Sequence, residues 1–236
     1  MKISVSGTYS SGKTSTVMAL SHYTGVPRSL ARTIREIMPE ALPGVKLVDV
    51  TPPQFLQLTL RRHTGRAVQE ALLGDHFISD GSSLQEWLYG EGRLRHGMNP
   101  NATADGASGP SVVSAQEMAF FGKVVEQYGQ AFKQHVKATY DAYVHLRHEL
   151  PIASDGHRPM NNEFRTTIDT MLLATLDELR IPYHVVSGSM AERLETIAGI
   201  FGWTPVMSTA EAIELARQEY GRQDFRMEYE RIPASA

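Results

Sequence analysis

The feature that most constrains the fold lies close to the N-terminus, where residues 7–14 read GTYSSGKT. These residues match the pattern G-x-x-x-x-G-K-[ST] at every fixed position. Residues 3–6 alternate apolar and small polar side chains, which predicts a strand, and residues 13–23 have the periodicity of a helix. The chain is therefore expected to begin with a strand, a tight loop bounded by glycines, and a helix.

The chemistry of this loop explains its spacing. Glycine at position 7 lets the chain leave the strand in a turn, and glycine at position 12 lets backbone approach an anion closely. The amide groups that follow point inward at the head of a helix, where a phosphate is stabilised. Lys13 is expected to reach the β- and γ-phosphates of ATP, and the Thr14 hydroxyl to coordinate Mg²⁺. The residues predicted to bind the nucleotide are Gly7, Ser10, Ser11, Gly12, Lys13, Thr14 and Ser15.

Strands and helices alternate along most of the chain, a pattern typical of a parallel sheet with helices on both faces. We therefore expect an α/β fold with three layers, α/β/α, and a mostly parallel sheet of five strands. Ligands bind such sheets at the carboxyl ends of the strands, where the glycine-bounded loop and Asp80 are placed. The predicted strands are residues 3–6, 76–80, 140–146 and 183–186, with one more before Arg32.

Two segments depart from this regular pattern. Residues 90–114 are rich in Gly, Asn, Ala, Ser and Pro, and we predict a mobile insertion there. Its end is marked by Ser114 and Glu117, which form a capping box that opens a helix. Residues 222–236 have no clear period and are predicted to form a loosely held tail. The length of 236 residues fits a single domain that carries both segments.

Charge and composition exclude several classes of protein. The net charge of −3 leaves no strongly basic stripe for a nucleic acid, and no run of about 18 apolar residues could span a membrane. The chain has no cysteine, which excludes disulfides and thiolate chemistry, and its nine histidines show no metal-ligand spacing. The N-terminal apolar stretch is too short for a signal peptide. We expect a soluble, cytoplasmic protein without a nucleic-acid or membrane partner.

The loop motif does not by itself name the reaction, because NTPases, transporter ATPases and kinases all share it. The chain contains neither the guanine-reading motif N-K-x-D nor the L-S-G-G-Q signature of transporter ATPases. Both absences favour a small kinase. The alternatives are an ATPase or switch subunit that acts on a protein partner, and a nucleotide-sensing module without turnover.

Three parts of the chain resemble a known group of proteins. The loop at residues 7–14, the strand ending at Asp80 and the segment PIASDGHR at residues 151–158 are similar to the ribosylnicotinamide-kinase-like P-loop domains. That group belongs to the small AAA-type ATP-binding domains, and the resemblance covers roughly residues 1–202. The chain lacks the DNA-binding and nucleotidyl-transfer domains of the best-known regulator in the group. Because it also carries the insertion, ribosylnicotinamide itself is not taken over as the acceptor.

The resemblance also implies a lid. In that family an Asp-Gly-x-Arg segment follows the fourth strand and closes over ATP, which corresponds here to a lid at residues 147–165. Its arginine would be Arg158, after Asp155 and Gly156. Arg165 would be a second lid arginine that binds the nucleotide. Arginines so placed stabilise charge on the transferring phosphoryl group, and the alternative for both is a solvated helix face.

Three further residues are candidates for the acceptor side. Asp80 is either a general base on the acceptor hydroxyl or a Mg²⁺ ligand, and its simplest alternative is a helix cap. Arg32 and Arg35 follow a predicted strand, and their guanidinium groups suit a phosphate or carboxylate on the acceptor. Surface arginines are common, so a purely structural role for these two residues stays open.

Together these features predict an ATP- and Mg²⁺-dependent kinase. The γ-phosphoryl group would pass to a small acceptor, nucleoside-like or a specialised metabolite, and Lys13, Asp80 and Arg158 are the candidate catalytic residues. The acceptor would lie between Asp80, the segment of Arg32 and Arg35, and the insertion. The sequence does not determine the oligomeric state.

Overall fold

The computed structural model describes residues 1–99, 113–147 and 161–222. Four strands in these residues form one sheet in the order β2-β1-β3-β4, and every neighbouring pair is parallel. The two central strands, β1 and β3, are buried along almost their whole length. The strands are β1 (Lys2–Ser6), β2 (Phe77–Asp80), β3 (Ala142–Leu146) and β4 (Tyr183–Val186).

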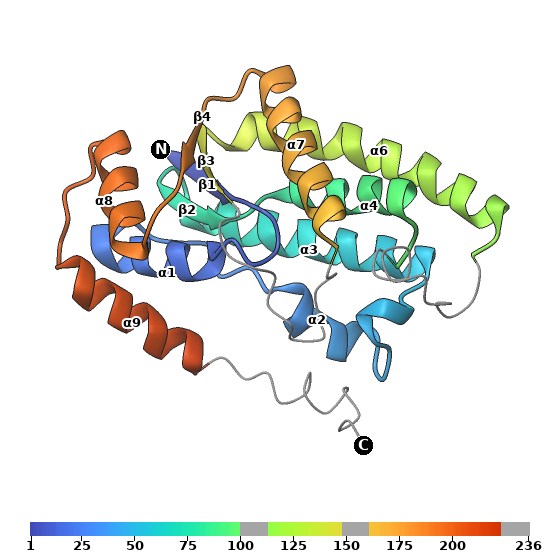
Figure 1. Ribbon diagram of the computed structural model, residues 1–236, viewed down its shortest axis with the longest axis horizontal. Helices are drawn as coiled ribbons and strands as arrows, with labels where there is room; N and C mark the ends of the chain where they lie inside the picture. The colour runs from blue at the N-terminus through green and yellow to red at the C-terminus, as the bar shows by residue number, and fades with distance from the viewer. Residues whose placement is uncertain (100–112, 148–160, 223–236) are drawn as a thin grey trace.

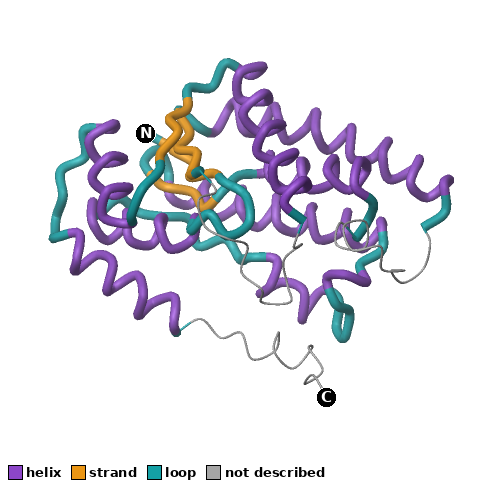
Figure 2. The backbone as a smooth tube through the Cα atoms, in the orientation of Figure 1, coloured by secondary structure: helices purple, strands orange, loops and turns teal. Residues whose placement is uncertain are grey.

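Helices cover both faces of the sheet, so the predicted three-layer α/β fold is confirmed (Figure 1). Helices α1, α8 and α9 pack on one face, while α4, α6 and α7 pack on the other. Figure 2 shows the strands enclosed between these two groups of helices. The bounds are α1 (Lys13–Thr24), α2 (Ile34–Ala41), α3 (Pro52–Leu73), α4 (Ser83–His96), α6 (Ala115–Thr139), α7 (Asn162–Leu179), α8 (Met190–Phe201) and α9 (Thr209–Gly221), with a short 3-10 helix at Leu47–Asp49.

The predicted fifth strand is not formed in the described residues. In its place a single parallel bridge joins Arg28 to Ile78 at the outer edge of β2. Ile78 donates its N–H to the Pro27 carbonyl and accepts a hydrogen bond from the Ser29 amide, both at 2.9 Å. Proline carries no N–H, so Pro27 cannot supply the next hydrogen bond of a longer ladder.

Helix α4 is longer than the composition suggests, and the predicted start of the insertion at residue 90 is wrong. The helix continues to His96, and residues 90–96 belong to it. Its two internal glycines mark close packing: a Cβ at Gly92 would lie 2.6 Å from the Phe164 ring, and one at Gly90 would lie 3.1 Å from Val125. The glycines therefore let neighbouring helices approach α4. Residues 100–112 of the predicted insertion lie outside the described residues.

Capping explains where several helices begin. Ser114 accepts a hydrogen bond from the Glu117 amide at the start of α6, which confirms the predicted capping box. Ser189 and Ser208 open α8 and α9 in the same way. Each such cap satisfies backbone donors that the first turn of a helix leaves unpaired. Within the described ranges, no helix combines the length and apolar character that crossing a membrane requires.

Candidate active site

The glycine-bounded loop connects β1 to α1, as predicted, and its backbone has the conformation that the glycines allow. Gly7 has φ +145°, and a Cβ there would lie 2.6 Å from Ser11 Oγ and 2.9 Å from the Leu146 carbonyl oxygen. Gly12 is in the left-handed region at φ 81° and caps the N-terminus of α1. Ser10 also has positive φ, at 59°. The loop therefore curls over the unpaired amides of α1, which is the arrangement that binds phosphate.

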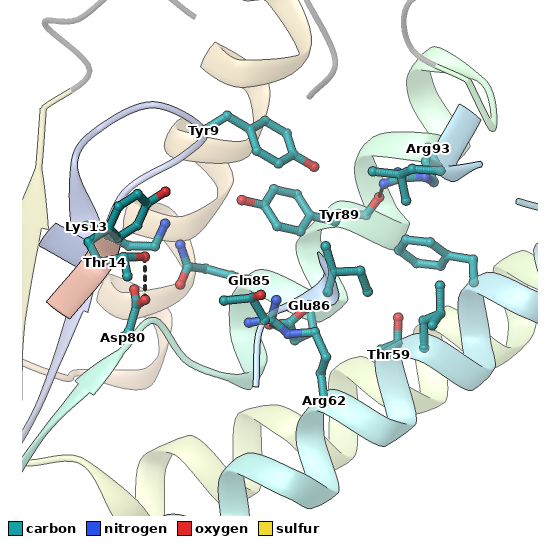
Figure 3. Close-up of a pocket in the computed structure, with 16 residues that line it drawn as sticks. Tyr9, Lys13, Thr14, Thr59, Arg62, Asp80, Gln85, Glu86, Tyr89 and Arg93 are labelled. Atoms are coloured by element: carbon teal, nitrogen blue, oxygen red, sulfur yellow. Dashed lines mark hydrogen bonds and ion pairs between the residues drawn. The ribbon is translucent and has the colours of Figure 1, made fainter. Parts of the chain in front are cut away.

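Lys13, Thr14 and Asp80 come together at the carboxyl edge of the sheet. Asp80 is the last residue of β2 and pairs in register with Val5 of β1, which places its side chain beside the loop. The Thr14 hydroxyl donates a 2.6 Å hydrogen bond to Asp80 Oδ2 (Figure 3). Asp80 Oδ1 is buried and has no hydrogen-bond partner in the described parts of the chain. Burial lowers the pKa of the Lys13 ammonium, and the Asp80 carboxylate opposes that shift.

Arg193 supports the loop from the other side. It lies in the first turn of α8, where its Nη1 donates to the Ser11 carbonyl oxygen at 2.8 Å and its Nε donates to the Gly188 carbonyl oxygen at 2.9 Å. The side chain is buried, so these are charge-assisted hydrogen bonds away from solvent. No local motif marks this residue in the sequence. The capping box at Ser189 marks the start of α8 and so places Arg193 in its first turn. The contact between Arg193 and the loop depends on the tertiary fold.

The proposed second lid arginine, Arg165, lies against the loop. It is buried in the first turn of α7, and its Nε donates to the Thr8 hydroxyl at 3.3 Å. Thr8 in turn donates to Asp169 Oδ2 at 3.2 Å, so two residues of α7 contact the first variable position of the loop. Burial lowers the pKa of Arg165, and Asp169 opposes this shift. Arg158 and the rest of residues 148–160 lie outside the described residues.

A cavity of about 180 Å³ opens beside Lys13, Thr14 and Asp80 (Figure 3). Aromatic rings form much of its wall. The rings of Tyr9 and Tyr89 stack with centroids 4.9 Å apart and an interplanar angle of 6°. Burial raises the pKa of both phenols, which keeps them neutral. The other residues that line the cavity are Thr33, Ile34, Leu47, Phe55, Leu58, Thr59, Arg62, Gln85, Glu86, Arg93 and Tyr220.

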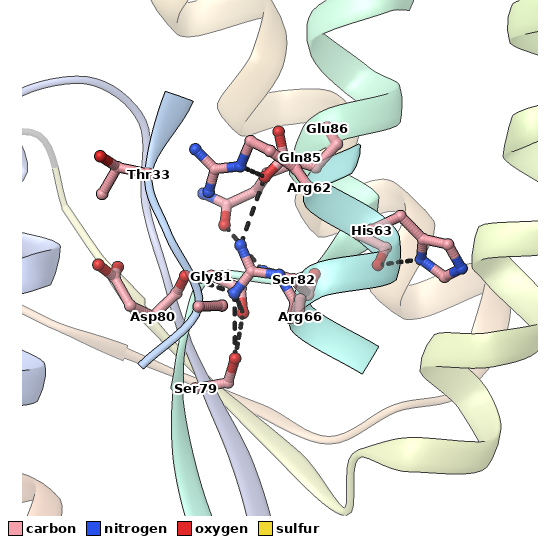
Figure 4. A network of polar contacts seen from close by, with 12 residues as sticks. Thr33, Arg62, His63, Arg66, Ser79, Asp80, Gly81, Ser82, Gln85 and Glu86 are labelled. Atoms are coloured by element: carbon pink, nitrogen blue, oxygen red, sulfur yellow. Dashed lines mark hydrogen bonds and ion pairs between the residues drawn. The ribbon is translucent and has the colours of Figure 1, made fainter. Parts of the chain in front are cut away.

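Buried charges face the same cavity from α3 and α4. Arg62 Nε lies 2.9 Å from Glu86 Oε1, and Arg66 Nη2 lies 3.4 Å from the same oxygen. Arg66 also donates to the carbonyl oxygens of Asp80 and Gly81, at 2.7 and 3.1 Å (Figure 4). Arg66 therefore fixes the turn that carries Asp80, while Arg62 and Glu86 present a paired cation and anion to the cavity. These three residues were not predicted, because no local motif in the sequence marks them.

Arg32, one of the two arginines proposed for the acceptor, lies outside this cavity. The Arg32 guanidinium donates to Glu40 Oε2 at 2.7 Å and to the Glu36 carbonyl oxygen, so both of these contacts are with α2. Arg32 lines a separate hollow of about 430 Å³ between α2 and α3, and not the cavity beside Lys13. Arg35 is the second residue of α2. Of the predicted site, the structure thus brings Lys13, Thr14 and Asp80 together and leaves Arg32 apart from them.

Comparisons with known proteins identify the family and the fold of the chain. A family model described as an AAA domain matches residues 2–193, and no curated protein matches the sequence. Solved structures of deoxyadenosine kinase from M. mycoides share the fold. The form with bound dATP has a TM-score of 0.61 at 14% identity, over 86% of this chain and 100% of the kinase chain. The form with bound dCTP has a TM-score of 0.56 at 13% identity, over 86% and 99%.

The family match covers the loop, the sheet edge at Asp80 and the first turn of α8, which are the parts that build the site. At 13–14% identity the likeness to the kinases shows the fold alone. The predicted resemblance to small AAA-type ATP-binding domains is confirmed. The chain belongs to the AAA domain family and has the α/β fold of P-loop nucleoside kinases.

Proposed function

We propose that the protein is a kinase that transfers the γ-phosphoryl group of ATP to a small, nucleoside-like acceptor. One observation carries this proposal: a single cavity is lined both by Lys13, Thr14 and Asp80 and by the stacked rings of Tyr9 and Tyr89. An acceptor held by the rings would therefore present its hydroxyl group next to the phosphate loop. Phosphoryl transfer demands mainly positioning and charge stabilisation from the protein, which this geometry can supply.

The residues at the loop fit ATP with Mg²⁺. Glycine at positions 7 and 12 lets the loop backbone pack closely against Ser11 and Arg193, and the N-terminus of α1 offers its amides to phosphate oxygens. Oxygen ligands suit Mg²⁺, and the Thr14 hydroxyl and the Asp80 carboxylate, with its unpartnered buried Oδ1, would hold it. When bound, the ion supplies neutralisation of charge on the β- and γ-phosphates.

Asp80 has two candidate roles, which the geometry keeps open. Its hydrogen bond with Thr14 supports a role as a metal ligand. Its position on the cavity supports a role as the base that accepts the proton of the acceptor hydroxyl. Lys13 would neutralise charge on the γ-phosphoryl group in either case.

The cavity wall supports a nucleoside-like acceptor. A heterocycle could stack on Tyr9 or Tyr89, while the guanidinium of Arg62 and the carboxylate of Glu86 offer donors and an acceptor for its polar edge. The structural neighbours support the same class, because they are described as deoxyadenosine kinases with bound deoxynucleotides or products.

The proposal keeps three further predictions from the sequence. Arg158 is a candidate catalytic residue, and the insertion excludes water from the acceptor. The chain forms a single domain with a lid at residues 147–165 and a tail at residues 222–236.

A screen for ADP release tests the proposal. Purified protein with ATP and Mg²⁺ is given nucleosides, nucleotides and amino sugars, one at a time, and phosphorylated products are identified by mass spectrometry. We expect release to depend on a nucleoside. Lys13→Ala should lower turnover by about 10²-fold or more, because a preorganised charge partner of the phosphates is lost. Lys2→Ala, which removes an amine bonded to Asp75 far from the loop, is the matched control.

ADP release at the same rate with and without every acceptor would contradict a kinase and favour an ATPase or switch that acts on a partner. A Lys13→Ala variant with the turnover of the Lys2→Ala control would contradict the role of the loop.

A further inference from the structure

The last helix reaches the cavity that the proposed function assigns to the acceptor. Tyr220, in the last turn of α9, lines this cavity together with Lys13 and Asp80. The family match ends at residue 193, and α9 begins at Thr209. Among the described residues that line the cavity, Tyr220 alone comes from beyond that match. The cavity is therefore completed by a part of the chain that the family model does not include.

The sequence of α9 places Tyr220 on the buried face of the helix. Ala212, Ala216 and Tyr220 are spaced by four residues, so they lie on one face. Ala212 and Ala216 are buried in the core cluster that includes residues of α1, and Tyr220 packs against the same cluster. The two small side chains let α9 approach α1 closely, and the larger tyrosine follows where that face ends at the cavity.

A half-buried cluster of polar contacts around Glu219 holds this end of α9. Glu219 Oε2 lies 3.1 Å from His22 Nε2 of α1, and Glu219 Oε1 pairs with the guanidinium of Arg28. The Arg28 side chain is 13% exposed and that of Glu219 is 36% exposed, so the pair is partly shielded from solvent. Arg28 also forms the single bridge to Ile78 at the edge of β2. Glu219 thus ties α9 to two segments that come much earlier in the chain.

These contacts connect two walls of the cavity. The chain that passes through Arg28 continues to Thr33 and Ile34, which line the cavity, and Glu219 is the immediate neighbour of Tyr220. A tyrosine ring offers a flat apolar surface and one hydroxyl that can donate or accept a hydrogen bond. Such a side chain suits an acceptor that combines a ring with hydroxyl groups.

We propose that α9 forms a wall of the acceptor pocket, in which Tyr220 contacts the acceptor and Glu219 is a positioning residue that acts through His22 and Arg28. The proposal rests on the proposed function for the identity of the pocket. The proposal also states that the cluster around Glu219 keeps the pocket closed, and this part can be tested without knowing the acceptor.

The absence of cysteine provides a test without ligand. Thr59 lines the cavity and is 4% exposed, so Thr59→Cys gives a single buried thiol in the pocket. Its alkylation by iodoacetamide is followed by mass spectrometry. Adding Glu219→Gln should raise the rate about fivefold or more, because loss of the ion pairs lets the wall open. The matched control is Glu214→Gln, on the same helix, whose carboxylate bonds to the exposed residues Arg217 and Gln218.

Equal alkylation rates in all three backgrounds would overturn the positioning role of Glu219.

The second measurement is steady-state kinetics with deoxyadenosine as the acceptor probe. Tyr220→Ala should raise the KM for deoxyadenosine about tenfold and leave the KM for ATP within about twofold, as expected for one lost side-chain contact. Tyr220→Phe keeps the ring and separates the effect of the hydroxyl.

Leu215→Ala, which truncates an exposed residue of α9, controls for general effects on the helix. A Tyr220→Ala variant with an unchanged KM for deoxyadenosine would overturn the acceptor contact. If the unmodified protein phosphorylates no nucleoside, the proposed function fails, whereas the alkylation rates still decide whether α9 closes the pocket.

Discussion

Asp80 is fixed by neighbours on three elements, yet one of its oxygens is left unsatisfied. Its Oδ2 accepts a hydrogen bond from Thr14, its carbonyl oxygen accepts one from Arg66, and the following amide bonds to the Val5 carbonyl oxygen. Oδ1 is buried without a partner in the described residues. A buried unpaired carboxylate oxygen is costly, so its retention at this sheet edge is best explained by a ligand or a transferred proton.

Asp80→Asn distinguishes the two roles. If Asp80 is the base, kcat should fall by about 10²–10⁴ even at saturating Mg²⁺. If Asp80 is a metal ligand, the Mg²⁺ concentration for half-maximal activity should rise, and added Mg²⁺ should restore part of kcat. A Mg²⁺ titration of the variant separates these outcomes. Asp75→Asn, at an almost fully exposed site before β2, is the control. An unchanged kcat and Mg²⁺ dependence would exclude both roles.

Arg193 is expected to act on ATP through the loop backbone. Arg193→Ala removes buried hydrogen bonds to the carbonyl oxygens of Ser11 and Gly188, each worth about 1.5–3 kcal/mol when the donor is charged. The KM for ATP should therefore rise about tenfold or more, while the KM for the acceptor changes less. Arg193→Lys should recover part of the loss. A variant with lower thermal stability but an unchanged KM for ATP would show that Arg193 only supports the fold.

At the scale of whole elements, the helix boundaries show which parts of the fold are encoded locally. The capping serines at 114, 189 and 208 were recognisable because the cap and its partner lie three residues apart. The end of α4 was not recognisable, because Gly90 and Gly92 read as loop residues unless the side chains that approach them are known. The missing fifth strand was not recognisable for the same reason. Its pairing partner would be β2, which is distant in sequence, and Pro27 limits that pairing.

The packing at α4 predicts an asymmetric response to alanine. A Cβ at Gly92 would lie 2.6 Å from the Phe164 ring and 2.7 Å from Ile168, so Gly92→Ala should destabilise the protein by about 1–3 kcal/mol. Gly199 in α8 has nothing within 4 Å of a built Cβ, so Gly199→Ala should be neutral or stabilising by up to about 1 kcal/mol. Chemical denaturation measures both. Equal effects of the two substitutions would contradict this account of the helix contact.

For the molecule as a whole, stability should depend on pH through His63. Its ring stacks on Phe132 with centroids 4.3 Å apart, and its Nδ1 lies 2.7 Å from Ser83 Oγ. Burial first, then His135 and Arg66, lower the pKa of His63 from 6.5 to about 4. Between these values the unfolded chain binds a proton that the folded protein does not. The free energy of unfolding should therefore decrease as the pH falls from 6.5 towards 4.

The measurement is denaturation at several pH values across that window. His63→Gln removes the titrating ring, so its free energy of unfolding should decrease less steeply with falling pH than that of the unmodified protein. The slope is the readout, since the substitution also changes the packing against Phe132. Parallel curves for the two proteins would show that His63 does not contribute to the pH dependence.

The site was predictable where one short motif carries it. Residues 7–14 identified the phosphate loop, and the strand that ends at Asp80 identified the carboxylate that lies beside this loop. Arg62 and Glu86 could not be found in this way, because they come from α3 and α4 and form their ion pair on the cavity wall only in the folded protein. Arg32 illustrates the converse: the sequence placed it near the acceptor, and in the structure it pairs with Glu40 of α2.

The central position of β1 has a consequence for how the protein acquires its site. Ile3 pairs with Ile78 on one side and with Ala142 on the other, so both ladders join segments far apart in the chain. Contacts of such long range form slowly, because much of the chain must be ordered before they become favourable. The phosphate loop lies immediately after β1, and a Cβ at Gly7 would approach the carbonyl oxygen of Leu146 on β3. Nucleotide binding should therefore appear late in refolding and report completion of the sheet.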